Sequence, residues 1–177
     1  MANFEIAKNE TLLKEGKYSN RPEDAGGETK YGITIRVARE EGYEGAMIDF
    51  PIELADRIYK KLYWDKLKLD LVSSQPIANE LFDTAVNCGA MTASIFLQRV
   101  LNVLNREARD WEDIKVDGIV GAKTIGTLEI ASRKREKNIL LFLNVLQGAR
   151  YIELATTSSR HDELNINGWA QRITLNY

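Results

Sequence analysis

Residues 74–89 read SQPIANELFDTAVNCG, and this stretch carries the clearest folding signal in the chain. Ser74 is a preferred helix-capping residue, and Pro76 fits the first turn of a helix. Apolar side chains then recur at steps of three and four residues: Ile77, Leu81, Phe82, Ala85 and Val86. Gly89 is typical of a helix end. The stretch therefore predicts a helix with a strongly apolar face.

A second apolar helix follows directly, over residues 91–105. Its apolar positions again keep helical spacing: Ile95, Phe96, Val100, Leu101 and Leu104. Burying five such side chains contributes about 8–15 kcal/mol before the ordering costs are subtracted. We therefore expect this pair of helices to form the central hydrophobic element of the fold.

Helical periodicity continues through most of the remaining chain. We expect further helices over residues 3–15, from a cap at Thr34 to Glu41, from a cap at Asp49, and over 122–132, 136–157 and 167–175. Residues 16–33 interrupt the pattern with four glycines and one proline. They predict an irregular loop or a short hairpin. The predicted fold class is mainly α.

Composition narrows the possible functions. The chain has 177 residues, 44% hydrophobic and 28% charged, which is typical of a soluble globular protein. The net charge of −2 and the absence of a basic stripe give no reason to expect nucleic acid as a partner. No run approaches the ~18 apolar residues of a transmembrane helix, so we expect no membrane insertion.

The inventory of metal-binding side chains is also small. Cys88 is the only cysteine, so neither an intrachain disulfide nor a thiolate metal site can form. We expect this thiol to have a passive packing role. The sequence offers no cluster of metal ligands, and we predict neither a metal nor another cofactor.

Two acids near the amino terminus stand out as candidates for catalysis. Glu15 ends the first predicted helix, where apolar neighbours and the helix dipole raise a carboxyl pKa, as a general acid requires. Asp24 follows across a tight turn, where solvent keeps a carboxylate ionised. Thr29 is placed to hold a water with Asp24, and Tyr18 and Tyr31 offer flat rings for sugar faces. Glycosidic bonds are cut by such carboxylate pairs. The residues alone also fit a surface glutamate and an ordinary turn.

The same segment resembles a known family. From Glu15 to Thr34 the chain reads EGxYxNxPxDxGGxTxxGIT, which closely resembles the signature of the glycoside hydrolase family 108 muramidases. These are also known as secretion-activator-like proteins of bacteria and their phages. The resemblance extends to Tyr63-Trp64-Asp65, to residues 81–89 and to Gly168-Trp169-x-x-Arg172.

The resemblance implies a lysozyme-like helical fold and cleavage of peptidoglycan between N-acetylmuramic acid and N-acetylglucosamine. It implies that Glu15 is the catalytic acid. Lys17 replaces the second glycine of the family's Glu-Gly-Gly-Tyr motif, which changes the charge beside that acid. Glu15, Asp24 and Thr29 are also similar to the Glu/Asp/Thr set of phage-type lysozymes, which invert the anomeric centre.

The second half resembles the peptidoglycan-binding region that follows the catalytic region in this family. The matching positions are Leu97-Gln98-x-x-Leu101 and Asp117-Gly118-x-x-Gly121-x-x-Thr124. The same residues also fit a helix-turn-helix corner that touches no glycan. We predict a catalytic region over 1–92 and a peptidoglycan-binding-like region over 93–177 packed on it, with one compact domain as the alternative.

Four further side chains have two interpretations each. Asp83 and Asn87 share a helix face, and they either bind substrate opposite Glu15 or hydrogen-bond a neighbouring loop. Trp64 and Trp169 either stack on sugars or fill the core.

The predicted function is that of a peptidoglycan hydrolase of the lysozyme type, acting on glycan strands without an evident obligate protein partner. The start of the chain lacks the features of a signal peptide, so we expect cytoplasmic synthesis and action at the cell wall after release or export. One alternative is a non-catalytic wall-binding or secretion-associated protein that keeps the lysozyme-like fold. Another is a phage-borne regulator of export.

Overall fold

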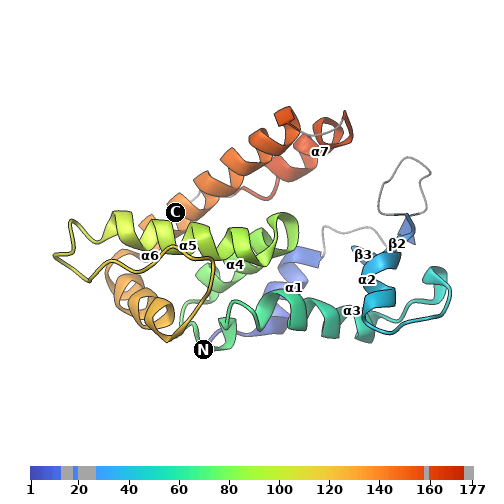
Figure 1. Ribbon diagram of the computed structural model, residues 1–177, viewed down its shortest axis with the longest axis horizontal. Helices are drawn as coiled ribbons and strands as arrows, with labels where there is room; N and C mark the ends of the chain where they lie inside the picture. Colours follow the sequence, from blue (N-terminus) through green and yellow to red (C-terminus); the bar gives the residue numbers. More distant parts are fainter. Residues whose placement is uncertain (13–17, 20–26, 158–159, 174–177) are drawn as a thin grey trace.

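The structure, a computed structural model, describes residues 1–12, 18–19, 27–157 and 160–173 (Figure 1). Its α-helices are α1 (Phe4–Leu12), α2 (Ile35–Glu40), α3 (Ile52–Tyr59), α4 (Gln75–Cys88), α5 (Ala90–Leu104), α6 (Ala122–Thr157) and α7 (Arg160–Ala170). The shorter elements are strands β1 (Tyr18–Ser19), β2 (Thr29–Lys30) and β3 (Ile33–Thr34), the 3₁₀ turns η1 (Met47–Asp49) and η3 (Leu69–Leu71), and the π-helical turn η2 (Lys60–Trp64). The predicted mainly α fold, with a short hairpin after the first helix, is confirmed.

Helix α4 lies at the centre of the molecule and packs against α1, α5 and α6 (Figure 1). Its start is the predicted one, because the Ser74 hydroxyl oxygen accepts a hydrogen bond from the Ile77 amide at 3.2 Å. Its end is also the predicted one, because Gly89 adopts φ +92° between α4 and α5. Local chemistry therefore fixes both ends of the central helix.

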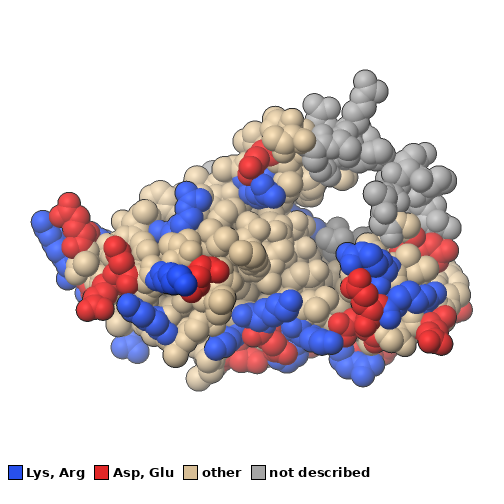
Figure 2. Space-filling view, viewed as in Figure 1, with Lys and Arg blue, Asp and Glu red and all other residues tan. Residues whose placement is uncertain are grey.

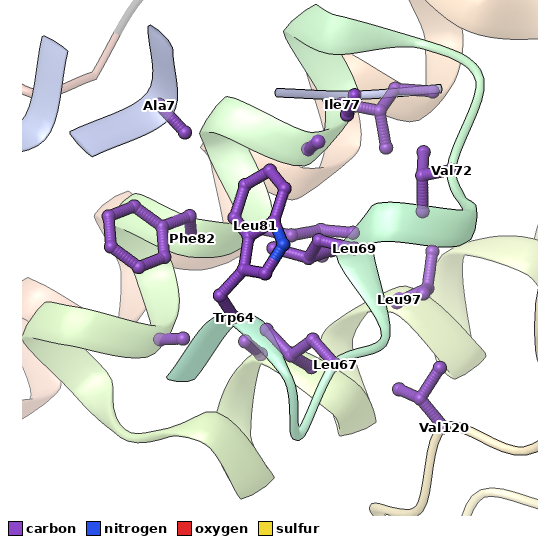
Figure 3. Close-up of a cluster of buried hydrophobic side chains, with 14 of the residues drawn as sticks. Ala7, Trp64, Leu67, Leu69, Val72, Ile77, Leu81, Phe82, Leu97 and Val120 are labelled. Atoms are coloured by element: carbon purple, nitrogen blue, oxygen red, sulfur yellow. The ribbon is translucent and has the colours of Figure 1, made fainter. Parts of the chain in front are cut away.

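The core surrounds the indole of Trp64 (Figure 3). Leu81 and Phe82 from α4, Leu97 from α5 and Val120 from the loop before α6 belong to the same continuous cluster. Trp64 is fully buried, and its indole N–H donates to Asp70 at 2.8 Å, which agrees with the core interpretation of this residue. Because the cluster includes residues on both sides of position 92, the two predicted regions share one core. The boundary between them stays a prediction.

The predicted start of α3 is wrong. Asp49 lies inside the turn η1, and Pro51 occupies the N-cap position, so the helix begins at Ile52. Proline lacks an N–H and fixes its own φ, which suits the edge of a helix and leaves Asp49 outside it. Helix α3 then widens into the π turn η2, where the Asp65 amide donates to the Lys60 carbonyl at 2.9 Å.

Helix α6 (Ala122–Thr157) agrees with the prediction for this part of the chain. The predicted break between helices over 122–132 and 136–157 is confirmed, because α6 consists of two helices that meet at a kink at Arg135 (φ −147°, ψ 33°). The Arg135 side chain pairs with Asp110 in the preceding loop.

Helix α7 spans Arg160–Ala170 rather than 167–175 and packs beside the second half of α6 (Figure 1). Its first residues are polar, so hydrophobic periodicity does not reveal where it begins. No helix in the described part of the chain is long and apolar enough to cross a membrane.

Candidate functional site

A three-stranded antiparallel sheet carries the described part of the predicted site. Strand β1 pairs with β2, which places Ser19 opposite Thr29, and β2 pairs with β3, which places Lys30 opposite Ile33. The two residues between β2 and β3 are Tyr31 (φ +52°) and Gly32 (φ +73°). Two positive φ angles define a type I′ turn, whose twist matches that of paired strands. The hairpin is therefore held in a single register.

Tyr31 is anchored from two sides. The Tyr59 hydroxyl on α3 donates to its backbone carbonyl at 2.8 Å, and the Lys30 ammonium lies 5.2 Å from the centre of its ring. Lys30 also donates to the Ile48 carbonyl at 2.5 Å, which ties the hairpin to η1. These contacts fix the turn against the helical body.

The sheet brings together three of the predicted site residues, Tyr18, Thr29 and Tyr31. Tyr18 is 39% exposed, and Thr29 and Tyr31 are partly buried. The Thr29 hydroxyl donates to the Gly27 carbonyl over a long 3.4 Å. Glu15 and Asp24, the two predicted catalytic acids, lie outside the described residues. The roles of all five residues stay predictions.

The remaining two candidates, Asp83 and Asn87, lie on the central helix α4. The Asp83 carboxylate is buried and accepts hydrogen bonds from Gln147 at 2.8 Å and from Arg172 at 2.7 Å. The Asn87 amide donates to the Asp83 backbone carbonyl at 2.8 Å. One carboxylate oxygen of Asp83 is therefore bonded to α6, and the other is bonded to the turn after α7. No hydrogen bond or ion pair among the described residues joins this pair to the sheet, and the predicted substrate contact stays untested.

The Asp83 contacts belong to a larger buried polar group between α4, α6 and α7. Tyr151, one helical turn after Gln147, is 2% exposed, and its ring stacks on Trp169 with centroids 5.0 Å apart. Burial, together with the nearby Asp83 charge, raises the pKa of the Tyr151 hydroxyl. Burial also raises the pKa of Cys88 to about 11. This thiol therefore stays protonated near neutral pH, as a packing role requires.

Our predictions from the sequence include neither Gln147 as a partner of Asp83 nor Tyr151 as the ring that stacks on Trp169. A signal for them exists in α6, because Ile139, Leu143, Gln147 and Tyr151 follow one another at four-residue steps on one buried face. A glutamine in an apolar stripe must find a hydrogen-bond partner, since burial without one is costly. The apolar stripe of α6 does not indicate that this partner is Asp83 on α4.

The Gln98 and Asp117-Gly118 motifs form one hydrogen-bonded unit. The Gln98 amide oxygen accepts from the backbone amides of Asp117 at 3.0 Å and Gly118 at 2.9 Å. Its amide nitrogen donates to the Asp117 carboxylate at 2.9 Å and to the Ile119 carbonyl at 3.0 Å. The hydrogen bond from Gln98, followed by one from the Ile119 backbone amide, lowers the pKa of the Asp117 carboxyl. The motif therefore locks the 117–119 turn onto α5.

Charge on the molecular surface is mixed. On the face shown in Figure 2, acidic and basic side chains lie close to one another, mainly near the two ends and the lower edge. This mixture fits the formal net charge of −2.

Comparison with known proteins adds to this geometry. No curated protein sequence matches the chain. Among solved structures, the chain is similar to one described as the structure of Brucella abortus SagA, with 22% sequence identity and a TM-score of 0.69. The similarity covers 96% of this chain and 92% of the other, and at this identity it shows the fold.

Two family models match consecutive parts of the chain. Residues 8–89 match Glycosyl hydrolase 108, and residues 92–174 match a Predicted Peptidoglycan domain. The resemblance that the sequence predicted is confirmed, and the chain combines a glycosyl hydrolase 108 region with a predicted peptidoglycan domain.

Proposed function

We propose that this chain is a lysozyme-type N-acetylmuramidase that cleaves peptidoglycan between N-acetylmuramic acid and N-acetylglucosamine. The observation that carries the proposal is the family match over residues 8–89, which contains Glu15, Asp24 and Thr29. The adjoining match to a predicted peptidoglycan domain supports the same polymer as the target.

In the proposed reaction, Glu15 protonates the oxygen of the leaving sugar while the glycosidic bond breaks. Asp24 accepts a proton from a water that attacks the opposite face of the oxocarbenium-like centre. Thr29 orients that water. The pairing of β2 with β1 and β3 fixes the register of Thr29, and its hydroxyl donates to the Gly27 carbonyl over a long 3.4 Å, which supports this last role.

Tyr18 and Tyr31 supply ring surfaces for the sugars in this proposal. Tyr18 is 39% exposed, and the backbone of Tyr31 is held by Tyr59. A ring of this kind packs against the apolar face of a sugar and leaves the sugar hydroxyls to polar groups. Tyr18 lies on β1 and Tyr31 in the turn between β2 and β3, so both belong to the sheet that carries Thr29, and substrate contact and water orientation share one support.

The test is digestion of purified peptidoglycan by the full chain and by its Glu15→Gln variant. Mass analysis of the soluble products reports which sugar carries the new reducing end. We expect N-acetylmuramic acid at that end, and a rate about 100-fold or more lower for the Glu15→Gln variant, because general acid catalysis is lost. Glu10→Gln is the matched control, since Glu10 precedes Glu15 by five positions in the sequence and accepts a hydrogen bond from Asn79 that glutamine can also accept.

Three outcomes would contradict the proposal. N-acetylglucosamine at the new reducing end would mean a different bond specificity. Full activity in Glu15→Gln would remove that residue from the mechanism. Binding to insoluble peptidoglycan without release of any soluble fragment would favour the non-catalytic alternative, in which Lys17 has replaced a family glycine at the cost of activity.

A further inference from the structure

An open groove of about 680 Å³ lies where the two family-matched regions meet. One wall comes from η2 and the residues just after it, with Leu62, Tyr63 and Lys66. The other wall comes from the start of α5 and the 117–120 turn, with Met91, Ile119 and Val120. Neither matched region forms this groove alone.

The second wall is rigid and apolar. Gln98 fixes the 117–119 turn through four hydrogen bonds, and the turn then holds the Ile119 side chain 69% exposed. Met91, 66% exposed, lies against Gly118, where an added Cβ would come within 3.0 Å of the Met91 side chain. Gly118 also has φ +75°, so glycine serves both the turn and this close approach. Two large apolar side chains are thus presented to solvent on a fixed support.

The first wall supplies a cation that is available to a ligand. Lys60 pairs with Asp65 and Asp70, and Lys61 pairs with Glu41. Lys66 is exposed and makes no ion pair or hydrogen bond with any of the described residues. The groove therefore has positive charge available at one side and apolar surface at the other.

Two further polar side chains of the groove, Asp117 and Ser94, are already bonded within the protein. The Asp117 carboxylate accepts from Gln98 and from the Ile119 amide at 3.0 Å. The Ser94 hydroxyl donates to the Ala90 carbonyl at 2.8 Å. A peptide with small apolar side chains and a terminal carboxylate offers methyl groups to the exposed Met91 and Ile119 and a negative charge to Lys66, whereas a glycan presents mainly hydroxyls. The chemistry of the groove therefore favours a peptide over a sugar.

We propose that this groove binds the stem peptide of peptidoglycan, a short extended peptide rich in alanine methyl groups that ends in a free carboxylate. The carboxylate pairs with Lys66, and the methyl groups pack against Met91, Ile119 and Val120. This inference rests on the proposed function for the identity of the polymer. It adds that the hydrolase region and the peptidoglycan domain hold the peptide jointly.

The test is calorimetric titration of the full chain with a synthetic stem pentapeptide ending in a free carboxylate. We expect saturable binding, and binding about 5- to 10-fold weaker for Lys66→Met and for the same peptide with an amidated end, because a charge pair is lost. Lys137→Met is the matched control, since Lys137 is an exposed lysine of α6 outside the groove. Ile119→Ser should also weaken binding, whereas Val103→Ser, at a position 70% exposed on α5, should not.

The outcomes separate this inference from the proposed function. A chain that releases muropeptides but does not bind the pentapeptide, or binds it equally well after Lys66→Met and Ile119→Ser, would overturn the groove assignment alone. Binding of a chitin oligosaccharide that these two substitutions weaken would also overturn it, because the groove would then hold sugar. A chain that binds the pentapeptide through Lys66 but hydrolyses no glycan would contradict the proposed muramidase activity and would still support the groove as a peptide-binding site.

Discussion

Arg172 and Asp83 are 89 positions apart in the sequence, and the Arg172 guanidinium donates to the Asp83 carboxylate at 2.7 Å. The two side chains are only 7% and 12% exposed. The pair joins the turn after α7 to the central helix α4. A buried ion pair therefore connects the part matched by the Predicted Peptidoglycan domain, residues 92–174, to the part matched by Glycosyl hydrolase 108, residues 8–89. Gln147 supplies a further bond to the same carboxylate at 2.8 Å.

Arg172→Met should destabilise the protein strongly. It leaves the Asp83 charge buried without its cation, which costs about 3–5 kcal/mol in comparable pairs. Urea unfolding followed by circular dichroism measures the loss. Arg36→Met is the control, because the Arg36–Glu40 pair is exposed and contributes about 0.5 kcal/mol or less. Adding Asp83→Asn to Arg172→Met should recover part of the loss, and strictly additive effects would show that the two residues are not coupled.

Gln98→Ala should lower the free energy of unfolding by about 2–4 kcal/mol. The change removes four hydrogen bonds and leaves the Asp117 and Gly118 amides without their acceptor. Chemical denaturation gives the value, with Gln171→Ala as the control at an exposed position after α7. If the two variants unfold at the same urea concentration, the amide of Gln98 does not stabilise the turn.

Asp117→Asn should change how stability depends on pH. Gln98 and the Ile119 amide hold the pKa of Asp117 below its usual value. A carboxyl with a lowered folded pKa stabilises the protein above its unfolded pKa of about 3.9 and loses that contribution as pH falls through the folded pKa. The stability difference between wild type and Asp117→Asn should therefore be constant above about pH 5 and shrink below about pH 4. Unfolding curves from pH 7 to pH 2.5 measure it, and a difference that grows on acidification would contradict the assignment.

Cys88 should react slowly with thiol reagents in the folded protein. Burial raises its pKa to about 11, so about one thiol in a thousand is ionised at pH 8. We expect modification by a disulfide reagent at pH 8 to be at least about tenfold slower in native protein than in urea. Free cysteine in the same urea solution is the reference for full reactivity. Equal rates in the folded and unfolded states would mean that the thiol is not protected.

The sequence predicts the helix ends that depend on residues close to one another in the chain. Ser74 caps α4 and Thr34 caps α2, each through a hydrogen bond to an amide three residues later. Gly89 ends α4 with a positive φ. Such signals act within one turn of backbone, and periodicity adds the apolar faces of α4 and α5.

Features that depend on distant contacts were not predictable. The partner of Asp83 comes from a turn near the other end of the chain, and nothing in the spacing around Arg172 indicates it. The motif around Asp117 was visible, but its bonding to Gln98 needed the fold. Helix α7 begins seven residues before the predicted start, because its packing against α6, rather than its own apolar pattern, defines it.

The continuous core limits how this protein can evolve. Leu97 and Val120 belong to the same apolar cluster as Trp64 and Leu81, so the two halves fill each other's interior. Genetic recombination that exchanged the carboxy-terminal half for an unrelated module would remove part of that interior and expose α4 to solvent. The two halves must therefore be inherited as one unit, with compensating substitutions arising across the seam between them.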